Sequence, residues 1–106
     1  MECTYISDMA GPHFEWDPRK ATQNVAKHGV TFLEAQTVFE DEEALFMPDP
    51  DHSGDEERFI LLGLSAALRV LVVIHCERGD GEVIRLISAR KAVPRERAAY
   101  TQRRVR

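Results

Sequence analysis

Residues 83–100 read VIRLISARKAVPRERAAY, and this stretch decides the end of the fold. Its first part, Val83–Arg90, is rich in aliphatic and β-branched residues and predicts a strand. Pro94 then suits the first turn of a helix. The segment 85–106 holds eight Lys or Arg residues and one acid, whereas the other residues include six bases and seventeen acids. Such a cationic end indicates a place where phosphate or an acidic protein partner is held.

The composition is that of one ordinary globular domain. The chain has 106 residues and a net charge of −4, with 43% hydrophobic and 30% charged residues. No apolar run is long enough to cross a membrane, and the first residues lack the pattern of a secretory signal. Cys3 and Cys76 do not make a disulfide framework. We therefore expect a cytoplasmic protein with reduced thiols, in which Cys76 is structural.

The first residues show no periodicity and predict a loose leader over residues 1–13. Translation could start at Met1 or at Met9, and a single domain is expected over residues 14–106. Phe14–Trp16 resembles a short first strand.

Two helices are expected next. Asp17 and Pro18 form an N-cap and first-turn pair, and Gly29 stands where a left-handed C-cap would end that helix. A second helix should begin at Thr31, because Glu34 completes a capping box.

Four strand-like runs follow: a short one around Ala44–Met47, and then Arg58–Ser65, Arg69–Arg78 and Glu82–Arg90. The last three are joined by short turns, which makes neighbouring strands antiparallel. The predicted fold is therefore α+β: two N-terminal helices packed on a roughly four-stranded antiparallel sheet, with a C-terminal helix.

Strict alternation along residues 83–90 puts Arg85 and Ala89 on one face, and Leu86 and Arg90 on the other. Because a charge among aliphatic side chains must be paired or functional, Arg85 is a candidate site residue. The alternative is that Arg85 pairs with an acid such as Glu77 or Glu57 and helps to hold the sheet.

The terminal helix carries groups that suit metal-free RNA cleavage. Glu96 and Tyr100 are four residues apart and face the same way, with Arg90 and Arg97 nearby. This reaction needs a base, an acid and cations that stabilise the charged phosphorane. The alternative is a solvated basic helix whose Tyr100 packs on the sheet.

His52 is a further candidate for proton transfer, because it lies in a predicted loop beside Asp49 and Asp51. The spacing of these residues matches no specific metal pattern, so neither a metal nor another cofactor is expected. His75 is expected to be a strand residue with a local partner.

The chain resembles the BrnT toxin family from Phe14 to Tyr100. The matching residues include FEWDP at 14–18, KHGV at 27–30, HS at 52–53, EERF at 56–59 and RLISARKA at 85–92, followed by Glu96 and Tyr100. This resemblance implies a bacterial type II toxin with a RelE-like fold, a ribonuclease that arrests translation. It also implies a BrnA-like antitoxin, which blocks the toxin and contacts operator DNA.

The cationic C-terminal end and this resemblance together predict that Arg85 and Arg90 bind and stabilise the scissile phosphate, and that Glu96, Tyr100 or His52 transfers protons. Lys91, Arg97 and Arg58 would hold flanking RNA. The free toxin is expected to be a monomer. The alternative function is a non-catalytic antitoxin-binding module or corepressor, a decayed toxin whose basic helix accepts carboxylates instead of phosphates.

Overall fold

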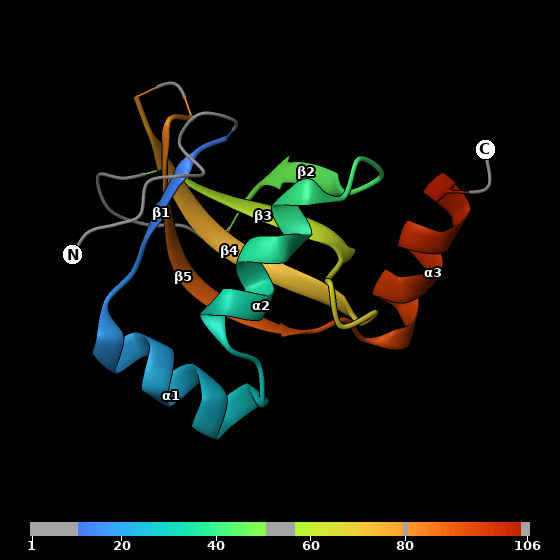
Figure 1. The fold of residues 1–106 in the computed structure, drawn as a ribbon. Coiled ribbons are helices and arrows are strands. Elements are labelled where there is room, and N and C mark those ends of the chain that lie inside the picture. The colour runs from blue at the N-terminus through green and yellow to red at the C-terminus, as the bar shows by residue number, and fades with distance from the viewer. Residues whose placement is uncertain (1–10, 51–56, 80, 105–106) are drawn as a thin grey trace.

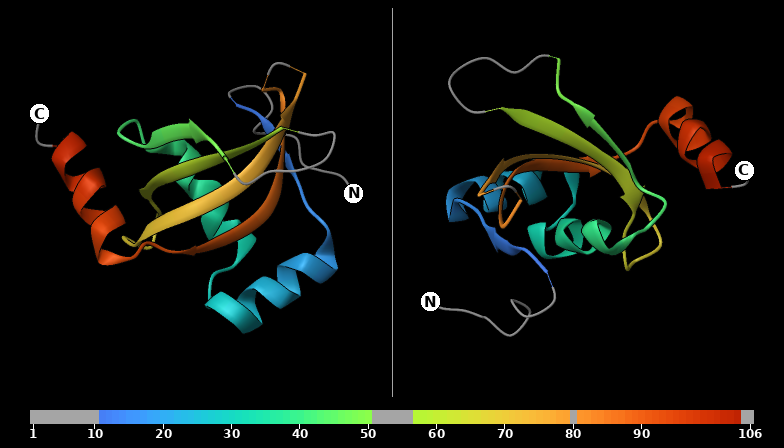
Figure 2. Two further views of the ribbon diagram at one scale, coloured as in Figure 1. Left: turned by 180° about the vertical axis from the view of Figure 1, so that it is seen from behind. Right: turned by 90° about the horizontal axis from the view of Figure 1, so that it is seen from above.

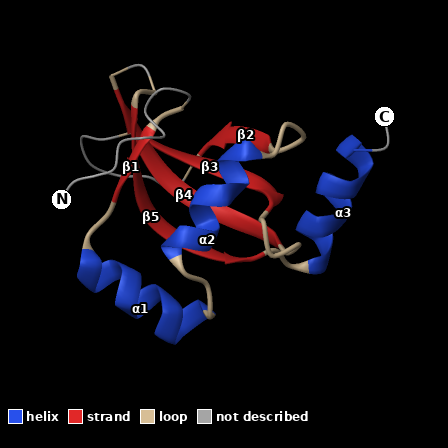
Figure 3. Ribbon diagram, in the orientation of Figure 1, coloured by secondary structure: helices blue, strands red, loops and turns tan. Residues whose placement is uncertain are grey.

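The computed structural model describes residues 11–50, 57–79 and 81–104. In chain order, the elements are β1 (His13–Glu15), α1 (Pro18–His28), α2 (Phe32–Thr37), a 3₁₀ turn (Val38–Glu40), β2 (Leu45–Pro48), β3 (Arg58–Leu64), β4 (Val70–Arg78), β5 (Val83–Lys91) and α3 (Pro94–Arg104). Figures 1 and 3 show the helices arranged around a single curved sheet. The α+β class is confirmed.

The sheet differs from the expected one in having five strands and mixed pairing. Its order is β1-β5-β4-β3-β2. The meander from β2 to β5 is antiparallel, as predicted, but β1 pairs parallel to β5, with Phe14 opposite Ile84. The expectation of four antiparallel strands was wrong here because the whole meander separates β1 from its partner, and no short turn signals that pairing.

Both predicted helix starts are confirmed, with one difference. The Asp17 carboxylate accepts a hydrogen bond from the Arg19 amide at 2.8 Å, and Gly29 ends α1 with φ of 70°. The Thr31 hydroxyl accepts from the Glu34 amide at 3.0 Å. The Glu34 carboxylate, however, does not return to the cap: it binds the guanidinium of Arg69 and the hydroxyl of Ser65.

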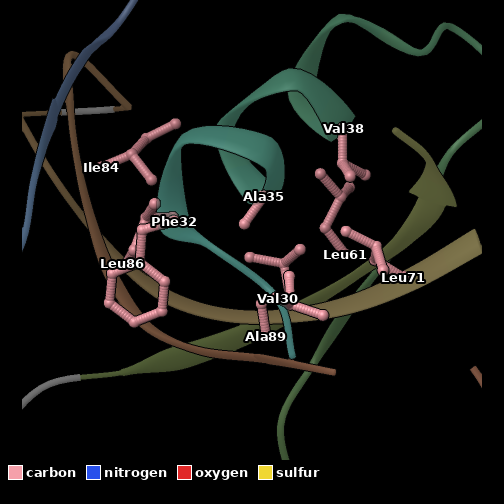
Figure 4. Close-up of a cluster of buried hydrophobic side chains, with 10 residues drawn as sticks. Val30, Phe32, Ala35, Val38, Leu61, Leu71, Ile84, Leu86 and Ala89 are labelled. Carbon is pink, nitrogen blue, oxygen red and sulfur yellow. The ribbon is translucent and has the colours of Figure 1, made fainter. Parts of the chain in front are cut away.

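One face of the sheet is covered by α2 and the 3₁₀ turn (Figure 4). This main core is formed by Val30, Phe32, Ala35, Val38, Leu61, Leu71, Val73, Ile84, Leu86 and Ala89. The second N-terminal helix is only six residues long before the 3₁₀ turn. The first helix, α1, lies along β5 (Figure 1). The two N-terminal helices therefore do not pack on the sheet as an equal pair, because α2 and the 3₁₀ turn cover the core face.

A β-bulge in β5 overturns the predicted sorting of its side chains. Ser88 is opposite Ile74 and Leu86 is opposite His75, so Ile87 has no partner on β4. The extra residue reverses the alternation. Leu86 and Ala89 therefore both enter the main core. Strict alternation predicted that these two side chains would lie on opposite faces of the sheet.

The same bulge brings Arg85 and Arg90 to one face of the sheet. Arg85 is opposite Cys76 and Arg90 is opposite Val72. Cys76 and Val72 are four residues apart on β4, so their side chains point to the same face of the sheet. We call this face, away from α2, the open face (Figure 2, left). No helix among the described residues is long and apolar enough to cross a membrane.

Candidate functional site

A groove lies on the open face where α3 meets the sheet. Its volume is about 440 Å³. The floor consists of aliphatic side chains from β2, β3 and β4: Leu45, Met47, Ile60, Leu62, Val72 and Ile74. The rim carries the polar residues Asp49, Arg90, Arg95 and Glu96. The groove thus combines an apolar floor with a charged rim, to which α3 contributes Arg95 and Glu96.

Arg90 and Glu96 form a two-pronged ion pair at this rim. Both guanidinium Nη atoms of Arg90 donate to the two carboxylate oxygens of Glu96 at 2.9 Å. Glu96 also accepts from the Val93 amide at 2.8 Å, which caps the start of α3. Hydrogen bonds from Arg90 hold the pKa of Glu96 below its usual range despite partial burial. The carboxyl group is therefore ionised at neutral pH.

Arg85 is also engaged by an acid. Its Nη1 lies 3.7 Å from the Glu15 carboxylate, which is 3.0 Å from Nη2 of Arg78. Arg85 therefore does pair with an acid, as the alternative interpretation expected, but this acid is Glu15 of β1 and not Glu77 or Glu57. This pair is about one-third exposed on both sides, so water screens it.

Strand register places Arg58 near Arg85. Both residues are opposite Cys76 of β4, one from β3 and the other from β5. At about 4.8 Å between strands, their Cα atoms lie about 10 Å apart across the buried Cys76. Thus two of the predicted RNA-contacting cations share the open face.

The other predicted cations lie around the start of α3. Lys91 is exposed at the end of β5. Arg97 is exposed on α3, and its Nη1 donates to the Ala92 carbonyl at 3.0 Å. Neither side chain lines the groove.

Tyr100 is buried, with 2% of its surface exposed. Its ring packs with Leu62 and Val72, and its hydroxyl donates to Asp41 Oδ2 at 2.5 Å. This is the position expected from the alternative interpretation, in which Tyr100 packs on the sheet. A role in proton transfer stays a prediction.

Two histidines complete the comparison with the sequence. His52 lies outside the described residues, so its role also stays a prediction. His75 is a fully buried strand residue with a local partner, as expected: its Nε2 is 3.1 Å from the Glu77 carboxylate. Among residues 11–50, 57–79 and 81–104, no group of three or more His, Cys, Asp or Glu residues could hold a metal.

Comparison with known proteins identifies the family. A family model described as "Ribonuclease toxin, BrnT, of type II toxin-antitoxin system" matches residues 16–96. The chain belongs to the BrnT family. The crystal structure of the Brucella abortus ribonuclease toxin BrnT is similar, with a TM-score of 0.60 and 26% identity over 77% of this chain and 97% of that one. No curated protein sequence matches.

Membership of the BrnT family places this chain among the ribonuclease toxins of type II toxin–antitoxin systems as a family, and it implies an antitoxin partner. The groove itself, and the roles of Glu15 and Asp41, escaped sequence reasoning. Glu15 lies in the FEWDP stretch at 14–18, but the sequence gives no sign of its partner on β5. Asp41 lies in an acidic run, where nothing separates it from its neighbours.

Proposed function

We propose that this chain is a metal-independent endoribonuclease that inhibits translation and is neutralised by a cognate antitoxin bound over the same surface. In this proposal the domain begins near residue 14 and is related to the RelE-like toxins. The observation that carries it is the Arg90–Glu96 pair at the rim of the groove, in a chain of a ribonuclease toxin family.

Arg90 suits the scissile phosphate because its planar guanidinium can grip two phosphate oxygens. In the free protein those two prongs are occupied by Glu96. A bound phosphate would compete for the same guanidinium. Arg90 would then stabilise the negative charge that builds up on the phosphorane.

Glu96 is the group that we assign as the general base. Its carboxyl group is ionised at neutral pH, and the hydrogen bonds from Arg90 lower its pKa further. When Arg90 turns to the phosphate, the carboxylate loses its cation and its pKa rises, which makes it a stronger base. It would take the proton of the ribose 2′-hydroxyl, whose oxygen attacks phosphorus as the bond to the 5′-oxygen breaks.

The leaving 5′-oxygen needs a proton donor. His52 and Tyr100 are the sequence-based candidates, and the burial of Tyr100 makes His52 the better one in this proposal. Arg85 and Arg58 would contact phosphates along the open face, and Lys91 and Arg97 would do so near α3. The product ends would be a cyclic phosphate and a free 5′-hydroxyl.

The direct test is cleavage of a fluorescent RNA by the purified chain in excess EDTA. We expect cleavage to persist in EDTA, to fall about 100-fold or more in Glu96→Gln, and to fall similarly in Arg90→Ala. Glu40→Gln, at an exposed acid on the 3₁₀ turn, is the matched control. Equal cleavage by all four proteins would remove Arg90 and Glu96 from the mechanism, and loss of cleavage in EDTA would overturn metal independence.

A non-catalytic antitoxin-binding module is the second candidate. It is favoured by the engagement of Arg85 and Arg90 with acids and by the aliphatic floor of the groove. The occupant would be an acidic amphipathic antitoxin segment, whose apolar side chains cover the floor and whose carboxylates replace Glu96 on Arg90. The antitoxin would carry the complex to operator DNA, with the toxin as corepressor.

The two candidates are separated by which property each substitution removes. Met47→Glu puts a negative charge on the groove floor, so it should weaken antitoxin binding measured by calorimetry. Glu96→Gln should abolish cleavage while leaving antitoxin affinity within about threefold. If Glu96→Gln changes binding alone and the wild-type chain cuts no RNA, the module is the function.

A further inference from the structure

A second, smaller pocket lies on the other side of β5, between that strand and α1. Its volume is about 190 Å³. Besides Asn24, five of its lining side chains can donate a hydrogen bond to an anion: Lys20, Gln23, Lys27 and His28 from α1, and Ser88 from β5. No acidic residue is among those that line it. The proposed cleavage mechanism uses none of these residues.

The lysines at this pocket differ from the two arginines predicted to bind the scissile phosphate. Arg85 and Arg90 each lie within 4.0 Å of a carboxylate. Lys20 and Lys27 have no ion pair within the described part of the chain, and both are exposed. A ligand would therefore meet two exposed lysines that form no ion pair with any acid in the described ranges.

The pocket is held in shape by a buried residue at its base. Asn24 is 5% exposed, and its side-chain amide bonds the carbonyl oxygens of Val30 and Ala89 and the amide of Ala89 at 2.8–3.0 Å. Lys20 and Lys27 lie four residues before and three after Asn24, so they share its side of the helix. Because Asn24 fixes α1 against β5, Lys20 and Lys27 lie beside the same part of that strand, at Ile87 and Ser88.

Strand β5 contributes residues to both this pocket and the groove. Ile87, the extra residue of the bulge, and Ser88 line the pocket, whereas Arg90 lines the groove. Ser88 and Arg90 point to the same face and are about 7 Å apart along the strand. A polymer held at Arg90 can therefore continue across Ser88 to α1.

We infer that this pocket is a phosphate-binding subsite for the RNA strand that flanks the cleavage site. Lys20 and Lys27 would neutralise one phosphodiester, and the Ser88 hydroxyl and His28 would donate hydrogen bonds to its oxygens. This inference rests on the proposed function, because it says where the RNA strand binds after it leaves the groove. It adds binding energy remote from the reacting bond, which positions the substrate.

The test is RNA binding without cleavage. A fluorescent oligoribonucleotide with 2′-O-methyl groups at every position keeps its phosphates but has no 2′-hydroxyl to react. Its affinity is measured by anisotropy over a series of salt concentrations, for the full chain and for three single variants: Lys20→Gln, Lys27→Gln and Arg19→Gln. Arg19 is the matched control, since it is an exposed cation on the same helix that does not line the pocket.

Each lysine variant should bind about fivefold to tenfold more weakly near 0.1 M salt, and the slope of log K against log salt should fall by about one unit. Arg19→Gln should bind within about twofold of the wild-type chain. Thermal unfolding of all four proteins should agree within about 2 °C, because these side chains are exposed.

Two results would overturn the subsite. If both lysine variants bind RNA as Arg19→Gln does, while the wild-type chain binds and cleaves RNA, the pocket takes no phosphate although the proposed function stands. If they keep RNA affinity and lose antitoxin affinity instead, the pocket belongs to an acidic protein segment. If the wild-type chain neither binds nor cleaves RNA, the proposed function fails and this inference fails with it.

Discussion

Asn24 illustrates how one residue can replace a length of strand. β1 pairs with β5 only at residues 83–85, and farther along β5 the Asn24 side chain bonds both the amide and the carbonyl of Ala89. It gives Ala89 the two partners that a longer β1 would have supplied. A third bond, to the Val30 carbonyl, ties the chain that enters α2.

Asn24→Ala should therefore lower the free energy of unfolding by about 2–4 kcal/mol, because buried backbone groups lose their partners. Urea denaturation measures this as a shift of the midpoint at constant slope. Gln23→Ala, next to it and exposed, should change stability by less than about 0.5 kcal/mol. Equal effects of the two substitutions would contradict the role of Asn24.

His75 is a buried polar residue among aromatic rings. The ring centroids of Phe39, Phe46 and Phe59 lie 4.9, 5.9 and 5.9 Å from its own. Burial lowers the pKa of His75, against the opposing effect of the Glu77 carboxylate. The imidazole is therefore neutral in the folded protein at neutral pH.

Stability should then fall as the pH drops below about 6.5, since the unfolded chain binds a proton that the folded chain does not. For one proton the slope is at most about 1.4 kcal/mol per pH unit. We expect His75→Leu to flatten the dependence of unfolding free energy on pH between about 7.5 and 5.5. If the curves of unfolding free energy against pH run parallel for the wild-type chain and His75→Leu, His75 is not the group responsible for the pH dependence.

At the scale of elements, α3 is anchored at both its ends, to β5 at its start and to the connection before β2 near its end. Glu96 ties its first turn to Arg90, and near its last turn Arg103 Nε donates to the Glu43 carbonyl at 3.1 Å. Between them, Tyr100 reaches Asp41, which also accepts from the Leu64 amide at 2.8 Å. Asp41 thus joins α3, β3 and the end of the 3₁₀ turn, and it keeps one wall of the groove in place.

Tyr100→Phe removes the hydroxyl but keeps the buried ring. We expect a loss of about 1.5–3 kcal/mol in unfolding free energy, the usual range for a hydrogen bond to a charged group. RNA cleavage under conditions where the protein is fully folded should change by less than about threefold. A loss of cleavage of 100-fold or more with unchanged stability would instead assign Tyr100 to proton transfer.

At the scale of the whole molecule, the two faces of the sheet differ in what they carry. The face under α2 holds the main core. The opposite, open face carries the groove, together with Arg58 and Arg85. The large exposed apolar side chains come from α1, α2, β2 and two connections: Val25, Leu33, Phe46, Leu68 and Val93. They are spread over several elements and do not suggest a broad interface between copies of the chain.

The free protein should accordingly be a monomer, and the larger assembly should form only with antitoxin. Light scattering coupled to size exclusion measures both masses. The scattering mass should stay near 12.1 kDa for the toxin alone over a tenfold range of concentration. A stable dimer of the toxin alone would contradict this view of the surface.

Local signals in the sequence determined most of the elements. Asp17, Gly29 and Thr31 mark helix ends through hydrogen bonds to nearby backbone, and the short turns of the meander make its strands antiparallel. The family resemblance follows from the same local stretches. Such features depend on residues only a few positions apart, so they can be read without coordinates.

The site was decided by tertiary structure. Only the fold pairs β1 with β5, which gives Arg85 the acid Glu15, and only the bulge at Ile87 puts Arg85 and Arg90 on one face. Periodicity cannot reveal an extra residue that has no sequence signal of its own. The partners of charged side chains lie far apart along the chain, so which cations are neutralised and which stay available depends on packing.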